Sequence, residues 1–177
     1  MYINSHIEKE ILEASKYYPV VMVCGQRQVG KSTMMNHIKE DNRRFVSLDD
    51  MNARRLAQKD PELFFETFGY PIVIDEFQRV PDILLEIKKI VDEKALKGED
   101  NKGLFWLTGS QKFKMMKYVS DSLAGRVAVY DMSGFSTSEI ENREFELFKP
   151  NIDFIKNRLK SSIDKDIHSV FELIYKG

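Results

Sequence analysis

The sequence predicts an α/β protein in which helices cover both faces of a parallel sheet. Three observations lead to this class. Five short apolar segments rich in β-branched and aromatic residues recur up to residue 130. Segments with helical periodicity separate them, and polar residues directly follow most of them. Strands of a parallel sheet are buried on both faces, so continuous apolar runs of this kind are typical of them.

The first two elements are a helix and a strand. Apolar residues at helical spacing predict a helix over residues 3–17, with Asn4 or Ser5 as its cap. The apolar run at residues 20–23 is short, β-branched and followed by glycine. It therefore predicts a buried parallel strand.

The next elements repeat the alternation. Residues 31–40 predict a helix, and residues 45–48 predict a second strand that ends at Asp49 and Asp50. We interpret these two carboxylates as caps for the helix that follows, because Asp is a preferred residue at helix N-termini. The alternative is that they assist a water or a metal ion.

A longer helical segment then leads to the third strand. Residues 51–67 predict a helix that is interrupted near Asp60 and Pro61. The very apolar run 72–74 predicts a strand, and a long helix with one apolar face starts at Pro81.

The last two strands are expected at residues 104–107 and 127–130, with a short helix between them. The fourth strand ends in a polar segment, residues 108–110. Ligands of open α/β sheets bind outside the carboxyl ends of the strands. The polar residues that follow the strands are therefore expected to gather at one edge of the sheet.

The pattern changes at Ser136. Residues 152–175 have helical periodicity, with a break expected at Asp164. We therefore expect two domains: a core at residues 1–135, and the start of a helical lid or second domain at residues 136–177. The helical pattern is still running at the last residue, so we expect this second domain to continue beyond it.

Composition excludes several classes of protein. The 177 residues include 27 basic and 28 acidic side chains, so the net charge of −1 argues against a uniformly basic nucleic-acid coat. The single cysteine, Cys24, excludes an intrachain disulfide and a cysteine-rich zinc site. Acidic residues near the N-terminus argue against a signal peptide, and no apolar run is long enough to cross a membrane. We expect a cytoplasmic protein without a membrane partner.

The segment GQRQVGKS at residues 25–32 matches the Walker A pattern of a phosphate-binding loop. Its backbone N–H groups would surround a β-phosphate, and Gly30 would allow close approach. Lys31 would reach the β- and γ-phosphates, Ser32 would bind Mg²⁺, and the helix N-terminus would favour the anion. The candidate nucleotide-binding residues are Gly25, Gln26, Arg27, Gln28, Val29, Gly30, Lys31, Ser32 and Thr33.

The third strand ends in Ile-Val-Ile-Asp-Glu, a Walker B pattern. Asp75 is the candidate second residue of the Mg²⁺ site, with Ser32. Glu76 follows directly and is a candidate general base for an attacking water. Because Glu-Phe-Gln follows Asp75 and no guanine-recognition motif is present, ATP is favoured over GTP.

Three further residues are candidates for catalysis. Ser110 and Gln111 follow the fourth strand, where a polar side chain can reach the γ-phosphate or its attacking water. Arg126 lies just before the fifth strand, and we expect it near the nucleotide edge as an arginine finger for a neighbouring subunit. For Ser110 the alternative is a helix cap, and for Arg126 it is a structural ion pair.

Five segments together resemble AAA-like ATPases of bacteria and archaea that carry a restriction-endonuclease-like C-terminal domain. They read GQRQVGKST, SLDD, IVIDEFQRVPDIL, WLTGSQKF and SLAGRVAVYDMS with FSTSEI, and they span residues 17 to 140. The resemblance implies an additional-strand P-loop fold, with the Ser110 strand between the Walker A and Walker B strands. It also implies ATP as the nucleotide, a sensor role for Ser110 or Gln111, and a finger position at Arg126.

The expected function is Mg²⁺-dependent ATP binding and hydrolysis that drives a conformational change in a further C-terminal region or a partner. Two alternatives stay open: a nucleotide-binding module without turnover and a small-molecule kinase. The expected partners are ATP, a second copy of the chain, and a nucleic acid or protein that binds through the C-terminal region.

Overall fold

The computed structural model describes residues 2–110, 112–143, 146–160 and 166–176. Gln111 and Asp164 lie outside these residues. The chain divides into two compact units, Met1–Phe135 and Ser136–Gly177. The two units are described separately.

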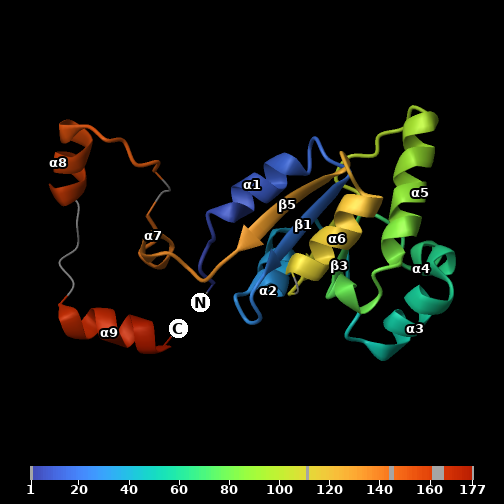
Figure 1. Cartoon of the computed structure of the whole chain (residues 1–177), viewed down its shortest axis with the longest axis horizontal. Helices are drawn as coiled ribbons and strands as arrows, with labels where there is room; N and C mark the ends of the chain where they lie inside the picture. Colours follow the sequence, from blue (N-terminus) through green and yellow to red (C-terminus); the bar gives the residue numbers. More distant parts are fainter. Residues whose placement is uncertain (1, 111, 144–145, 161–165, 177) are drawn as a thin grey trace. The chain divides into compact units, whose positions relative to one another are not determined.

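The first unit is built on a five-stranded sheet in which every neighbouring pair is parallel (Figure 1). The strands are β1 (Val20–Gly25), β2 (Arg44–Ser47), β3 (Ile72–Asp75), β4 (Phe105–Gly109) and β5 (Val127–Met132). Their order is β2-β3-β4-β1-β5. The predicted α/β class and the position of β4 between β1 and β3 are both confirmed.

Six α-helices and a short 3₁₀ helix connect the strands in the described part of this unit. They are α1 (Ile7–Ala14), α2 (Lys31–Ile38), α3 (Met51–Lys59), α4 (Pro61–Phe68), η1 (Phe77–Arg79), α5 (Ile83–Leu96) and α6 (Lys112–Ser122). The predicted interruption of the helix over 51–67 is confirmed. Asp60 ends α3 and caps α4 by accepting a hydrogen bond from the Leu63 N–H at 2.9 Å.

The first helix is shorter than predicted. It begins at Ile7, and the residue before it, His6, is the N-cap and makes no side-chain capping hydrogen bond. The predicted cap positions, Asn4 and Ser5, therefore precede the observed N-cap. The Glu8 carboxylate, inside the first turn, accepts a hydrogen bond from the Ser5 N–H at 2.7 Å. This bond from a glutamate back to the N–H three residues earlier is one half of a capping box.

Two apolar clusters cover the two faces of the sheet. Alternate residues of β1 point to opposite faces, so Met22 joins the cluster with α3–α6, whereas Val21 joins the cluster with α1 and α2. Trp106 is fully buried on the α1 side, where its indole N–H donates to Ser15 Oγ at 2.7 Å. Helices on both faces keep the sheet dry and leave its carboxyl edge open for ligands.

The second unit consists of short helices in its described residues. These are α7 (Thr137–Ile140), α8 (Ile152–Lys160) and α9 (Ile167–Lys176). Ser136 and Glu139 form a capping box at α7. Asn151 caps α8 by accepting from the Phe154 N–H at 2.7 Å. Among the described helices of the whole chain, none is long and apolar enough to cross a membrane.

Candidate functional site

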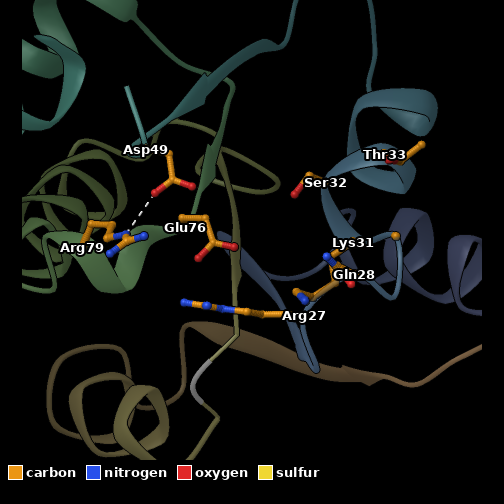
Figure 2. Close-up of a pocket in the computed structure, with 9 residues that line it drawn as sticks. Arg27, Gln28, Lys31, Ser32, Thr33, Asp49, Glu76 and Arg79 are labelled. Atoms are coloured by element: carbon orange, nitrogen blue, oxygen red, sulfur yellow. Dashed lines mark hydrogen bonds and ion pairs between the residues drawn. The ribbon is translucent and has the colours of Figure 1, made fainter. Parts of the chain in front are cut away.

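A cavity of about 430 Å³ opens at the carboxyl edge of the sheet. Figure 2 shows Lys31, Gln28 and Ser32 on one side, Asp49 and Arg79 on the other, and Glu76 between the two sides. The cavity is lined by Arg27, Gln28, Gly30, Lys31, Ser32, Thr33, Asp49, Glu76 and Arg79. Six of these nine residues come from the predicted phosphate loop and its helix, residues 25–33.

Two glycines give this loop its shape. Gly25 has φ of +151°, and a Cβ built on it would lie 2.0 Å from the carbonyl oxygen of Met132 on β5. Any side chain at Gly25 would therefore push β1 and β5 apart. Gly30 has φ of +92° and is the N-cap of α2. Its left-handed backbone turns the chain directly into the helix, so the helix N-terminus faces the cavity.

Lys31 is 5% exposed, although it carries a charge. Its Nζ donates to the carbonyl oxygen of Gly25 at 3.0 Å and to that of Gln26. Burial lowers the pKa of Lys31, while the nearby charges of Glu76 and Asp75 act in the opposite direction. Gly25 and Gln26 therefore contribute carbonyl acceptors for Lys31 and do not line the cavity. Val29 does not line it either, because it packs against the apolar cluster on the side of α1 and α2.

Asp75 is the buried carboxylate of the site, with 7% exposure. Ser32 Oγ donates to its Oδ1 at 2.7 Å, and Ser47 Oγ donates to its Oδ2 at 3.3 Å. Thr108 Oγ1 also donates to Oδ1. The predicted pair of Ser32 and Asp75 is thus in direct contact. Ser47 and Thr108 were missed, although both lie at the carboxyl ends of strands, which is the signal that could have identified them.

This oxygen-donor set fits Mg²⁺. Magnesium in phosphate-binding sites commonly takes one or two protein oxygens and keeps several waters, so a dedicated cage of carboxylates is unnecessary. In the described part of the chain no group of three or more His, Cys, Asp and Glu side chains could hold a metal ion. A hydroxyl and a carboxylate 2.7 Å apart beside the predicted phosphate loop match the magnesium pattern instead.

Glu76 has a left-handed backbone with φ of +56°. This turn separates β3 from η1 and presents the carboxylate to the cavity. The side-chain amide of Gln78 donates through its Nε2 to Glu76 Oε2 and, at 3.3 Å, to Ser110 Oγ. Gln78 therefore links Glu76 and Ser110, which the sequence analysis identified as separate candidates. It was missed because its position relative to Glu76 depends on the 3₁₀ turn.

Arg126 lies elsewhere, and the expectation that it is near the nucleotide edge of its own chain is wrong. Val127 at the start of β5 pairs with Val20 at the start of β1, whereas the loop follows the end of β1. Parallel strands start at the same edge, so Arg126 is at the opposite edge from the cavity. There its Nε forms an ion pair with Asp92 of α5 at 2.7 Å.

The wall opposite the loop contains an ion pair that the sequence did not indicate. Arg79 Nε lies 3.0 Å from Asp49 Oδ1, and Arg54 Nη2 lies 3.6 Å from the same oxygen. Asp50, not Asp49, caps α3, because Asp50 Oδ1 accepts from the N–H groups of Asn52 and Ala53. The cap assigned to both carboxylates is therefore correct for Asp50 alone.

Comparison with known proteins gives one family and two curated relatives. A family model described as an AAA domain matches residues 17–141, which contain every residue that lines the cavity. An uncharacterized protein of Mycobacterium tuberculosis and another of Mycobacterium bovis are each 32% identical to the chain over 124 residues. That stretch is 69% of this chain and 26% of each relative, so the chain matches only about a quarter of their length.

Proposed function

The chain belongs to the AAA domain family, and from that premise we propose that it binds ATP with Mg²⁺ and hydrolyses it. The observation that carries the proposal is the contact between Ser32 and Asp75, 2.7 Å apart, in the same site as Lys31 and Glu76. A phosphate-binding loop, an oxygen pair suited to magnesium and a carboxylate for water are the parts that nucleotide hydrolysis requires.

The loop and its helix would bind the phosphates. Backbone N–H groups of residues 25–32 and the N-terminus of α2 offer donors and a positive dipole to the anion. Lys31 would exchange its two carbonyl partners for oxygens of the β- and γ-phosphates, which are stronger acceptors. Ser32 and Asp75 would hold Mg²⁺, which neutralises the charge that develops on these phosphates when it is bound.

Glu76 would act on the attacking water. Its carboxylate accepts the proton as the water oxygen bonds to the γ-phosphorus, while the bond to the bridging oxygen of ADP breaks. The products are ADP and inorganic phosphate. Ser110 would orient the water or a γ-phosphate oxygen, since Gln78 connects it to Glu76. The same role is proposed for Gln111.

Arg126 would act on a neighbouring copy of the chain. It lies at the edge of the sheet away from its own cavity, so it can serve as an arginine finger only in another subunit. This assignment makes hydrolysis depend on association. Association would also require Arg126 to leave Asp92, an ion pair in which both side chains are about one-third exposed and which therefore contributes little to stability.

The two units have separate proposed roles. Residues 1–135 form the ATPase core, and residues 136–177 begin a helical lid or second domain. The core would drive a conformational change in that region or in a nucleic-acid or protein partner. A restriction-endonuclease-like C-terminal domain stays a prediction, which rests on the resemblance of the sequence to AAA-like ATPases that carry one.

A binding module without turnover is the second candidate function. The position of Arg126 favours it, because the cavity of a single chain lacks this cation. In such a module ATP would only stabilise a surface for a partner. A small-molecule kinase differs from both, because a hydroxyl compound would replace water as the acceptor.

Phosphate release from ATP separates these functions. The ATPase releases phosphate with Mg²⁺, and a chelator of Mg²⁺ abolishes the release. The binding module binds Mg-ATP in calorimetry without releasing phosphate. The kinase instead consumes ATP without equivalent free phosphate when a suitable hydroxyl compound is added. Failure to bind Mg-ATP at all would contradict the proposed function.

A further inference from the structure

The cavity wall opposite the loop consists of Asp49 and Arg79, which come from two neighbouring strands. Asp49 follows β2, and Arg79 ends η1, which follows β3 and Glu76. The Asp49 side chain is 56% exposed and the Arg79 side chain 43% exposed. Arg79 contacts Asp49 through its Nε. The two terminal nitrogens of the guanidinium carry four further N–H donors, so Arg79 can bind a second anion.

The charged residues around the cavity determine how strongly its far wall attracts a phosphate. Lys31, Arg27 and Arg79 are the cationic residues of the lining, and Asp49 and Glu76 are the anionic ones. ATP brings one more phosphate group than ADP, and that group adds negative charge to the cavity. With Arg79 held by Asp49, the far wall offers this additional anion little net attraction.

The ion pair between Arg79 and Asp49 can open at low cost. Exposed pairs of this kind contribute little to stability, and a phosphate is a stronger partner for arginine than one solvated carboxylate. Asp49 would keep a second cation, because Arg54 Nη2 lies 3.6 Å from the same oxygen. Arg54 is itself fixed by a 2.6 Å hydrogen bond from its Nε to the Leu48 carbonyl.

We propose that Arg79 is a γ-phosphate ligand supplied by the same chain, and that Asp49 holds it until ATP enters. The position of Glu76 selects the γ-phosphate. A base for the attacking water faces the γ-phosphorus on the side away from ADP, and Arg79 ends the 3₁₀ turn that directly follows Glu76. This inference rests on the proposed binding of ATP. It makes the site selective for ATP over ADP before any neighbouring subunit contributes Arg126.

Nucleotide affinity of the whole chain tests the proposal without any need for turnover. The probes are ADP and the β,γ-imido analogue of ATP, which cannot be hydrolysed at that bond, each with Mg²⁺ in calorimetry. Arg79→Gln is expected to lower the affinity for the analogue about 10- to 100-fold, the range for a lost charge-assisted hydrogen bond. The affinity for ADP should not change. Arg79→Lys keeps the charge but loses the forked donor, so an intermediate loss is expected.

Arg55→Gln is the matched control. It removes an exposed arginine of α3 that does not line the cavity. The affinity ratio between the analogue and ADP should therefore stay at the wild-type value. Thermal unfolding of each variant without nucleotide shows whether it is folded.

A double variant separates contact with phosphate from neutralisation of Asp49. If Arg79 touches the γ-phosphate, Asp49→Asn combined with Arg79→Gln still discriminates poorly between the analogue and ADP. If Arg79 only neutralises Asp49, that double variant regains wild-type selectivity, and the proposal is wrong. Undiminished analogue affinity in folded Arg79→Gln would overturn the inference alone. A wild-type chain that binds neither nucleotide would overturn the proposed function together with it.

Discussion

Glu76 is the residue on which the proposed chemistry depends. Its left-handed backbone directs the side chain into the cavity, and Gln78 donates to one of its carboxylate oxygens. This arrangement leaves the other carboxylate oxygen for the proton of a water. The neighbouring Asp75 accepts hydrogen bonds from three hydroxyl groups, which fix its carboxylate at the end of β3 beside Ser32.

Glu76→Gln should keep ATP affinity and lose hydrolysis. Glutamine has nearly the same size as glutamate but cannot accept the proton, so phosphate release should fall about 10²- to 10⁴-fold. Calorimetry and a phosphate-release assay measure the two effects separately. Glu10→Gln changes an exposed glutamate of α1 in the same way and should leave both unchanged. Wild-type turnover by the Glu76→Gln chain would refute the assignment.

The sequence located the principal residues of the site but not their partners. Lys31, Ser32, Asp75 and Glu76 could be identified because their motifs have fixed spacing. Thr108, Gln78 and Arg79 could not be identified in the same way. Their roles depend on the register between β3 and β4 and on the 3₁₀ turn after Glu76, and neither has a sequence signature as specific as the Walker patterns.

At the scale of elements, the start of α3 offers a measurable stability effect. Asp50→Ala removes the acceptor for two backbone N–H groups of α3, so the free energy of unfolding should fall by about 1 kcal/mol. Denaturant titration measures the change.

Asp49→Ala is the control for this cap. It removes the neighbouring carboxylate, which does not cap α3 and forms partly exposed ion pairs with Arg54 and Arg79, so a smaller effect is expected. Equal losses for the two variants would contradict the assignment of the cap to Asp50 alone.

Element positions were predictable where the pattern was strong. All five strands were expected, because their apolar runs are short and β-branched. The division between α3 and α4 was expected as well, since Pro61 cannot continue the preceding helix. The first helix was predicted too long because its apolar spacing extends beyond the turns that form. Periodicity does not show that the Glu8 carboxylate bonds the Ser5 N–H just before the observed first turn.

At the scale of the whole molecule, the position of Arg126 predicts that activity depends on protein concentration. Specific phosphate release should rise with the concentration of the chain, and Arg126→Ala should abolish the rise with little effect on ATP binding. Fingers contribute about 10³- to 10⁵-fold to turnover, well above the contribution of an exposed ion pair.

Mixing two inactive variants tests whether the finger acts between chains. Chains with Glu76→Gln keep Arg126, and chains with Arg126→Ala keep Glu76, so the mixture should recover part of the activity. Concentration-independent hydrolysis without recovery would show that Arg126 is no finger and has only the structural role of its Asp92 pair.

The order of the strands shows what periodicity leaves open. Alternating strands and helices predict a parallel sheet, but they do not predict that β4 lies between β1 and β3. That position was predicted from the resemblance to AAA-like ATPases. The same gap explains the error at Arg126. Its place after the Ser110 strand and just before the fifth strand suggested the nucleotide edge, although a residue that precedes a parallel strand lies at the opposite edge.

The central claim is that the loop at residues 25–32 binds Mg-ATP through Lys31. Calorimetric titration of Mg-ATP into the wild-type chain and into Lys31→Ala tests it most directly, with thermal unfolding to show that the variant is folded. The account predicts saturable binding by the wild type and loss of affinity in Lys31→Ala, because the buried ammonium group is the charge that the loop holds ready for phosphate. Undiminished Mg-ATP binding by folded Lys31→Ala would contradict it.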